Sequence, residues 1–187
     1  MSVASVDHTG PWTMADVLAL PEDGKHRIEL VGGALVMSPS PGIAHQRASH
    51  RLAALLDAAI EASQVPLEEV LEAVNVVVPG GLLIPDIAVM DAVASAEAGR
   101  AIHADDVLVV VEIASPLTRV TDRKMKPALY AAAGIPHYWR LELEPAPRLH
   151  LGQLENGTYR DRLVQAGETT ALSKPFAFDI DPARLVR

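Results

Sequence analysis

The chain has 187 residues, 49% of them hydrophobic and 21% charged, a balance typical of a folded globular domain and not of a disordered or fibrous protein. The formal net charge of -8 and the 4% content of aromatic residues argue against a broad basic surface or a row of base-stacking rings for nucleic acid. The absence of cysteine excludes disulfides and thiolate metal sites and fits the reducing cytoplasm.

Two further features bear on location and organisation. No uninterrupted apolar run is long enough to cross a membrane, and residues 1–12 lack the basic and apolar segments of a secretion signal. We therefore expect a cytoplasmic protein without membrane association. Residues 1–12 are largely polar, and no internal repeat follows them. We expect a flexible amino terminus and a single domain over residues 13–187.

The first half of the predicted domain combines two helices with short strands. Thr13 is placed as the N-cap of a short helix, with Asp16 in a capping-box position. Gly32-Gly33 interrupts an apolar segment and predicts the turn of a β-hairpin. Apolar residues at helical spacing predict a long helix with one buried stripe, made up of Leu52, Leu55, Leu56, Ala59 and Ile60. The expected elements are a helix over residues 13–20, a hairpin over 27–37, a helix over 44–63, and strands over 69–78 and 82–90.

The second half is expected to be richer in strands. Residues 107–114 form a near-continuous apolar run, the pattern of a strand covered on both faces. Asn156-Gly157 is a strong hairpin signal between two alternating segments. The other expected elements are an exposed loop or short helix over 92–104, a helix within 121–133, a strand over 138–143, an antiparallel pair over 148–151 and 159–164, and a final edge strand containing Phe176, Phe178 and Ile180.

Two carboxylates, Asp86 and Glu112, lie on strands that are otherwise strongly apolar. An ionised acid on a buried strand is costly unless it is paired or bound to a cation. Mg²⁺ prefers one or two protein carboxylates together with carbonyl and water oxygens. The pattern therefore favours a divalent-metal site that handles phosphate, with Asp86, Glu112 and the backbone carbonyl of Ile113 as ligands. A cluster of basic residues follows the second strand: Arg119, Arg123, Lys124 and Lys126.

Simpler interpretations exist for each of these residues. Each acid can pair with a nearby arginine or lysine without any metal. Glu29 alternates with Ile28 and Leu30 on its strand, which favours a solvent-facing side chain. His45 lies in the first turn of the long helix, where a solvated face is the simpler interpretation. Tyr130, Tyr138 and Trp139 are expected in the core or an interface.

An ordered set of segments resembles the PD-(D/E)XK nuclease superfamily, and most closely its Uma-type restriction-endonuclease family, a group of largely unassigned function. A lone Pro-Asp is a weak motif, but the ordered set is specific to the family and spans residues 15–143. The segments are residues 28–35, 38–45, Pro85-Asp86, 112–118, 122–126 with Tyr130, and 133–139.

The resemblance implies an α+β (α/β-like) fold of the restriction-endonuclease type: a central mixed β-sheet flanked by helices, with extra hairpins at the amino- and carboxyl-terminal sides. It also implies metal ligation by Asp86 and Glu112, with Glu29 and His45 gathered near the site. Glu29 would bind the ion through water, and His45 would contact a phosphate or transfer a proton.

The position of the catalytic lysine departs from the superfamily. Ala114 stands two residues after Glu112, where a lysine is usual, and in the closer family the lysine comes from the following helix at the position of Lys126. Pro127 follows Lys126 and disfavours helical geometry before it. Lys124 is the substitute if Lys126 points away, and Asp122 is as good an N-cap as a catalytic residue.

Two functional hypotheses follow. The first is an endonuclease that uses Mg²⁺ or Mn²⁺ to hydrolyse DNA phosphodiester bonds, acting as a homodimer by analogy with the family. The second is a nuclease-fold module with weak or no catalysis that binds nucleic acid or a protein partner, favoured by Ala114 and by the acidic net charge. A serine or cysteine hydrolase is disfavoured, because the chain has no cysteine and Ser115 lacks a glycine-rich nucleophile elbow.

Overall fold

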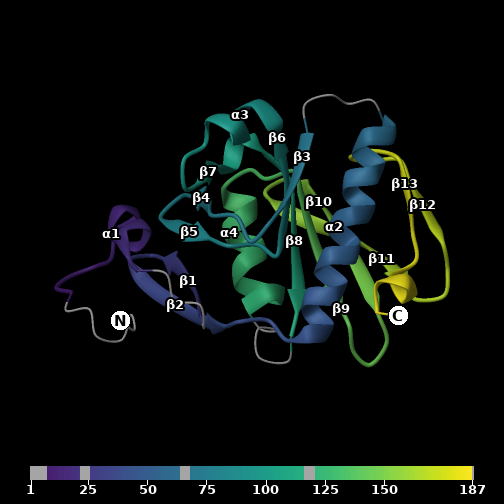
Figure 1. Ribbon diagram of the computed structural model, residues 1–187, viewed down its shortest axis with the longest axis horizontal. Helices are drawn as coiled ribbons and strands as arrows, with labels where there is room; N and C mark the ends of the chain where they lie inside the picture. Colours follow the sequence, from purple (N-terminus) through teal and green to yellow (C-terminus); the bar gives the residue numbers. More distant parts are fainter. Residues whose placement is uncertain (1–7, 22–25, 64–67, 116–120, 187) are drawn as a thin grey trace.

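The structure is a computed structural model that describes residues 8–21, 26–63, 68–115 and 121–186. Two larger sheets and one small sheet make up its β-structure (Figure 1). The five-stranded sheet has the order β2-β1-β5-β4-β7, and the six-stranded sheet the order β11-β10-β9-β8-β6-β3. The strands of the first are β1 (His26–Val31), β2 (Ala34–Pro39), β4 (Val76–Val78), β5 (Gly81–Leu83) and β7 (Ile102–His103).

The six-stranded sheet is the centre of the molecule. Its strands are antiparallel except for the parallel pair β8–β9. The mixed α+β architecture inferred from the family resemblance is therefore confirmed. The strands are β3 (Glu68–Glu72), β6 (Ile87–Asp91), β8 (Val107–Ala114), β9 (His137–Glu142), β10 (Arg148–Glu155) and β11 (Thr158–Gln165).

Helices pack on the two faces of this sheet. The long helix α2 (Ile43–Ser63) lies against one face, and α4 (Lys126–Ala132), preceded by the π-helical turn η3 (Thr121–Met125), packs on the other. The shorter helices are α1 (Met14–Ala19), α3 (Ala92–Glu97), and the 3₁₀ turns η2 (Ala104–Asp106) and η4 (Pro182–Leu185). Within the described ranges, no helix is long and apolar enough to cross a membrane.

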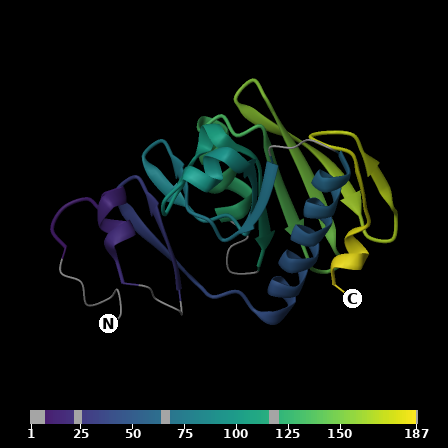
Figure 2. The same cartoon turned by 45° about the horizontal axis from the view of Figure 1, so that its top comes forward.

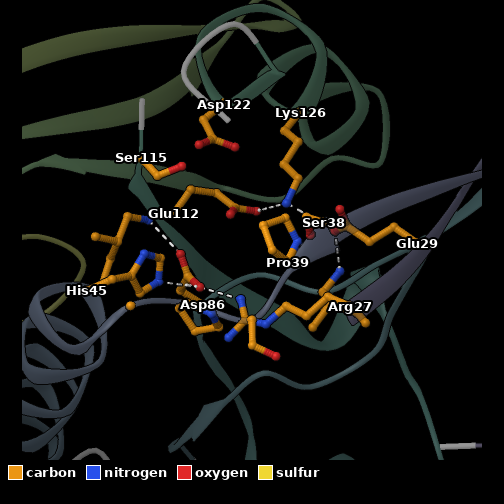
Figure 3. A pocket seen from close by; sticks show the side chains of 15 residues that line it. Arg27, Glu29, Ser38, Pro39, His45, Asp86, Glu112, Ser115, Asp122 and Lys126 are labelled. Atoms are coloured by element: carbon orange, nitrogen blue, oxygen red, sulfur yellow. Dashed lines mark hydrogen bonds and ion pairs between the residues drawn. The ribbon is translucent and has the colours of Figure 1, made fainter. Parts of the chain in front are cut away.

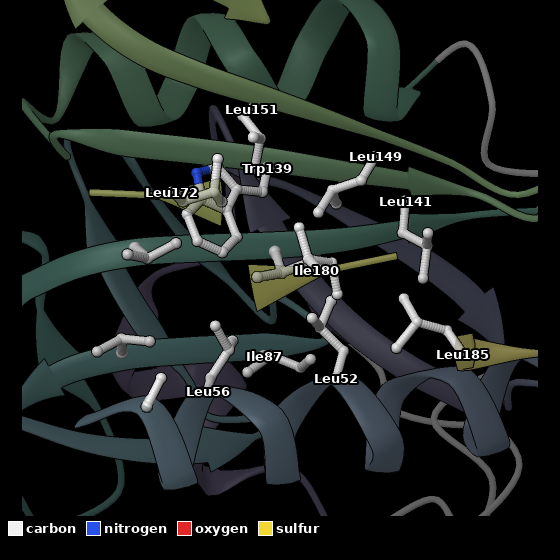
Figure 4. Packing of buried hydrophobic residues seen from close by; sticks show 14 of the residues in the cluster. Leu52, Leu56, Ile87, Trp139, Leu141, Leu149, Leu151, Leu172, Ile180 and Leu185 are labelled. Carbon is white, nitrogen blue, oxygen red and sulfur yellow. The ribbon is translucent and has the colours of Figure 1, made fainter. Parts of the chain in front are cut away.

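The largest core lies between α2 and the sheet (Figure 4). Leu52 and Leu56 of α2 are fully buried, as the helical spacing predicted, and belong to the same core as Trp139 and Leu141 of β9. Leu55 is 37% exposed, so the predicted stripe is narrower than expected at this position. Trp139 is a core residue, as expected.

The predicted strand over residues 69–78 is wrong as one element. It forms β3 and β4, which belong to different sheets. The break is at Ala73, whose φ of 55° is incompatible with an extended strand. The amide of Ala73 donates to the backbone oxygen of Asp86 at 3.1 Å, which joins this break to the candidate site.

The predicted strand over residues 82–90 is likewise divided into β5 and β6. Ile84, Pro85 and Asp86 lie between the two strands, at the place where the chain passes from one sheet to the other. A proline cannot donate to a strand ladder, which fits a break here. The consequence is that Asp86 lies at the junction of the two sheets.

The hairpins are confirmed at both ends of the chain. β1 and β2 turn at Gly32-Gly33, and with α1 they project to the left in Figures 1 and 2, opposite the carboxyl terminus. β10 and β11 turn at Asn156-Gly157 and are longer than predicted. The expected single edge strand of the tail is instead a separate pair, β12 (Thr170–Leu172) with β13 (Phe178–Ile180). Residues 1–7 of the expected flexible terminus lie outside the described residues.

Candidate active site

A cavity of about 160 Å³ lies at the junction of the two sheets (Figure 3). Its walls come from β1, β2, the first turn of α2, the β5–β6 junction, β8, and the η3–α4 segment. Polar and charged side chains meet there from segments far apart in the sequence. The labelled residues are Arg27, Glu29, Ser38, Pro39, His45, Asp86, Glu112, Ser115, Asp122 and Lys126.

Sheet register places Asp86 beside Glu112. β6 and β8 are antiparallel with Ile87 opposite Val111, so continuing the register by one residue sets Asp86 opposite Glu112. Residues opposite each other in an antiparallel pair share one face. The amide of Ile113 donates to Asp86 Oδ2 at 2.7 Å and fixes the carboxylate across the strand boundary.

The other oxygen of Asp86 faces two basic groups. Arg27 Nη1 of β1 forms an ion pair with Asp86 Oδ1, and His45 Nε2 of α2 lies 2.8 Å from the same oxygen. The His45 nitrogen is buried, but its direction is not that of a hydrogen bond. Burial raises the pKa of Asp86, but His45, Arg27 and the Ile113 amide outweigh burial and lower it overall.

Glu112 is paired with the lysine of α4. Lys126 Nζ lies 2.9 Å from Glu112 Oε1 and 3.0 Å from Glu29 Oε1, and the Tyr130 hydroxyl donates to Glu112 Oε1 at 2.9 Å. Glu29 in turn accepts a hydrogen bond from the Ile84 amide at 2.7 Å. The lysine is therefore held by two carboxylates that come from different sheets.

The acids of the cavity repel one another. Burial raises the pKa of Glu112 well above its ordinary value. Lys126 opposes this shift, while the nearby carboxylates of Asp86, Asp122 and Glu29 add to it. The pKa of Lys126 is also raised, because attraction to Glu112 and Glu29 outweighs the effect of its burial. The cavity thus has an excess of negative charge beside a charged lysine.

The donor chemistry of the cavity fits a hard divalent cation. Two carboxylates and a backbone carbonyl, from Asp86, Glu112 and Ile113, are a donor set that Mg²⁺ or Mn²⁺ accepts. A cation there would relieve the repulsion that raises the pKa of Glu112. Arg27 and His45 now face Asp86 Oδ1. As they stand, the described residues contain no group of three or more His, Asp or Glu side chains placed to hold a metal ion.

The structure decides between several interpretations of single residues. Glu29 is 3% exposed and faces the cavity, so the prediction of a solvent-facing side chain is wrong. His45 also faces the cavity, in contrast to the exposed Gln46 and Arg47 that follow it. Lys126 begins α4 with Pro127 at the next position and points inward, which a proline in the first helical turn permits.

The remaining predicted residues differ in position. Lys124 is exposed and does not line the cavity. Asp122 is buried in the π-helical turn and its side chain lines the cavity. Arg119 of the predicted basic cluster lies outside the described residues.

Two contacts of the acids were not predicted. Arg27 pairs with Asp86, and Tyr130 contacts Glu112. The signal for Arg27 was present in the sequence, because residues two apart on a strand share a face and Arg27 precedes Glu29 by two. Tyr130 lies four residues after Lys126, which places both on one face of a helix.

Residues 14–183 match the family model Uma2, described as "Putative restriction endonuclease". The chain belongs to the Uma2 family. A similar solved structure is described as a "putative nuclease belonging to DUF820" from Anabaena variabilis ATCC 29413. The TM-score is 0.76 and the identity 15%, over 94% of this chain and 98% of that chain, so this likeness shows a shared fold. No curated protein matches the sequence. The family places the cavity described above within a nuclease-like fold.

Proposed function

We propose that this Uma2 protein is a divalent-metal-dependent endonuclease that hydrolyses phosphodiester bonds of DNA. The observation that carries the proposal is the position of Lys126, whose amino group from α4 meets Glu112 and Glu29 beside Asp86. A lysine delivered from the helix supplies the charge that Ala114 lacks. Two adjacent carboxylates and a lysine are the groups expected at a phosphodiester-cleaving site.

Asp86, Glu112 and the Ile113 carbonyl would hold Mg²⁺ or Mn²⁺. When bound, such an ion makes a coordinated water more acidic and neutralises charge on the phosphate. Lys126 adds a fixed positive charge toward the charge that develops on the phosphate oxygens. Glu29 and Glu112 orient the lysine, and Tyr130 fixes Glu112 through its hydroxyl.

His45 is positioned at the entrance of the site. Its side chain is 16% exposed and its Nε2 lies beside Asp86, so the ring borders both the cavity and the solvent. From there it would contact a phosphate or transfer a proton to the leaving group.

We further propose that the protein acts as a homodimer, which would present two such sites to one duplex. Size-exclusion chromatography with light scattering measures the mass of the protein in solution and tests the dimer directly.

Plasmid cleavage tests the proposal. Wild-type protein with Mg²⁺ or Mn²⁺ is expected to nick or linearise plasmid DNA, and EDTA is expected to abolish this. Asp86→Asn, which keeps the shape of the side chain but removes its charge, is expected to be inactive while its thermal unfolding stays cooperative. Metal-dependent cutting by folded Asp86→Asn protein would contradict the proposal.

A second candidate is a binding module that does not cut. It is favoured by Ala114 and by the two acids, Glu29 and Glu112, that already contact Lys126. Well-folded wild-type protein that leaves DNA intact with both metals, yet retards the same DNA in a gel, would favour this candidate.

A further inference from the structure

A second concentration of charge lies on the six-stranded sheet, outside the catalytic cavity. Glu142 at the end of β9 is buried, with 5% of its side chain exposed. Arg123, Arg140 and Arg148 all contact its carboxylate: Arg123 Nη2 at 2.7 Å, Arg140 Nε at 3.1 Å and Arg148 Nη2 at 2.7 Å. We define these three residues as the arginine cluster.

The register of the strands puts the cluster on one face. Glu142 is opposite Arg148, and Arg140 is opposite His150, in the β9–β10 pair. Glu112 neighbours Arg140 in the parallel β8–β9 pair. Arg140 and Arg148 therefore lie on the same face of the sheet as Glu112, on β9 and β10, toward the β10–β11 edge. Arg123 reaches Glu142 from the π-helical turn η3.

A second cavity lies between the catalytic residues and Glu142, the residue that the three arginines contact. This cavity of about 340 Å³ is lined by Glu142 and shares Gly42, His45 and Ser115 with the catalytic cavity. Arg123 directly follows Asp122 in the π-helical turn that borders the catalytic cavity. A polymer bound at the catalytic site can thus continue onto the arginine cluster.

The charge of the cluster suits an anionic polymer. Three guanidinium groups contact one buried carboxylate, so these four groups together carry positive charge. Three further acids lie around them: Asp161, 3.4 Å from His150, Glu112 beside Arg140, and Asp122 before Arg123. Two of the guanidinium side chains remain accessible, Arg123 at 41% and Arg148 at 36% exposure. Arg148 reaches Glu142 through one nitrogen only, so its other N–H groups do not contact this carboxylate.

Glu142 serves to hold the arginines in place. Burial alone would raise the pKa of Glu142, but hydrogen bonds from Arg123 and Arg140 lower it, so the group stays ionised. Arginines fixed by a carboxylate lose less side-chain freedom when they bind phosphate, whose oxygens match the planar guanidinium. On a chain with a formal net charge of -8, such a local cluster is a distinctive feature.

We propose that the arginine cluster binds the DNA backbone next to the cleaved bond, and that Glu142 is the positioning residue that preorganises it. This inference rests on the proposed function, because it extends the same substrate from the catalytic cavity across β9 and β10. The contacts would be to phosphates and would carry no sequence preference of their own.

Equilibrium binding in EDTA tests the surface without cleavage. The probe is a fluorescein-labelled DNA duplex of about 20 base pairs, the salt runs from about 50 to 200 mM, and anisotropy is measured at each step. The double variant Arg123→Gln/Arg148→Gln is expected to bind roughly 10-fold more weakly at low salt and to lower the slope of log K against log salt by about 2.

The control is Arg162→Gln. Arg162 is exposed, but it pairs with Leu151 in the β10–β11 register and lies on the opposite face of the sheet. It is expected to keep the wild-type slope. The single variant Arg148→Gln, expected to lower the slope by about 1, replaces the double variant if that variant does not unfold cooperatively.

The possible results separate the two proposals. A wild-type slope in the double variant, an equal loss in Arg162→Gln, or no DNA binding by wild-type protein would each overturn the arginine cluster as a DNA surface. If one of these results is found and wild-type protein still cuts plasmid DNA with metal, the nuclease proposal stands. A reduced slope in protein that never cuts would support the surface and contradict the nuclease.

Discussion

At the scale of single residues, the cavity is a balance of buried charges. Lys126 is held by Glu112 and Glu29, and Asp86 by Arg27, His45 and the backbone. Buried charges are tolerated only when each has a partner. This pairing explains why these three acids can gather in one cavity before any cation is bound.

Replacing Lys126 by methionine should reduce DNA cleavage by roughly 10²–10³-fold, the usual effect of removing one group that stabilises transition-state charge. Lys124→Met is the matched control, since Lys124 is exposed two residues away and does not line the cavity. Initial rates of plasmid nicking compare the two variants. A larger loss of cleavage in the Lys124 variant than in the Lys126 variant would show that Lys126 is not the catalytic lysine.

The stability of Glu112→Gln relative to wild type should increase as pH rises, when both proteins are free of metal. The folded pKa of Glu112 lies well above the ordinary value of 4.5, so folded protein binds more protons than unfolded protein above that pH. Stability is then lost as pH rises through the folded pKa, and the glutamine removes this loss. In EDTA, the Tm of the variant relative to wild type should therefore rise from pH 4.5 to pH 8, whatever the constant cost of removing one partner of Lys126. A relative Tm that falls toward pH 8 would contradict this prediction.

Sequence reasoning reached part of this arrangement. Asp86, Glu112 and Lys126 stand out because polar groups interrupt apolar strands or match a family pattern. Glu29 was assigned to the wrong side by alternation alone, because both faces of β1 are covered: Ile28 and Leu30 pack in one apolar cluster, and Val31, on the face of Glu29, packs against another. Alternation says which residues share a face, but not which face meets the site.

At the scale of elements, two strand breaks create the site. The chain leaves one sheet at Ala73 and changes sheet again at Pro85, and an amide–carbonyl hydrogen bond ties Ala73 to Asp86. Pro85 was a readable signal against a continuous strand. Ala73 was not, because alanine at positive φ has no sequence signature and is imposed by the packing of two sheets.

Helix α2 supports His45 through its packing on β8 and β9. Leu52→Ala should destabilise the protein by about 2–5 kcal/mol, since Leu52 is fully buried and its truncation leaves a cavity. Leu55→Ala on the same helix is the control and should cost clearly less, because Leu55 is 37% exposed. Urea unfolding of both variants measures the difference. Equal losses would mean that the two leucines contribute alike to the core.

At the scale of the whole molecule, the site exists only through contacts between distant segments. Glu29 meets Ile84 and Asp86 meets Ile113, so neither the cavity nor its charges belong to one local motif. No periodicity in a single sequence can give such contacts. The family resemblance anticipated which residues gather, whereas the partners Arg27 and Tyr130 and the arginine cluster required the structure.

The central claim is that Asp86 and Glu112 form a divalent-metal site, and calorimetric titration with Mn²⁺ tests it most directly. We expect wild-type protein to bind the ion, with affinity rising with pH because the raised pKa of Glu112 means that this acid must first lose its proton. Asp86→Asn and Glu112→Gln should lose this binding, while Asp179→Asn, at an exposed position of β13, should keep it. Wild-type affinity in folded Asp86→Asn and Glu112→Gln protein would contradict the account.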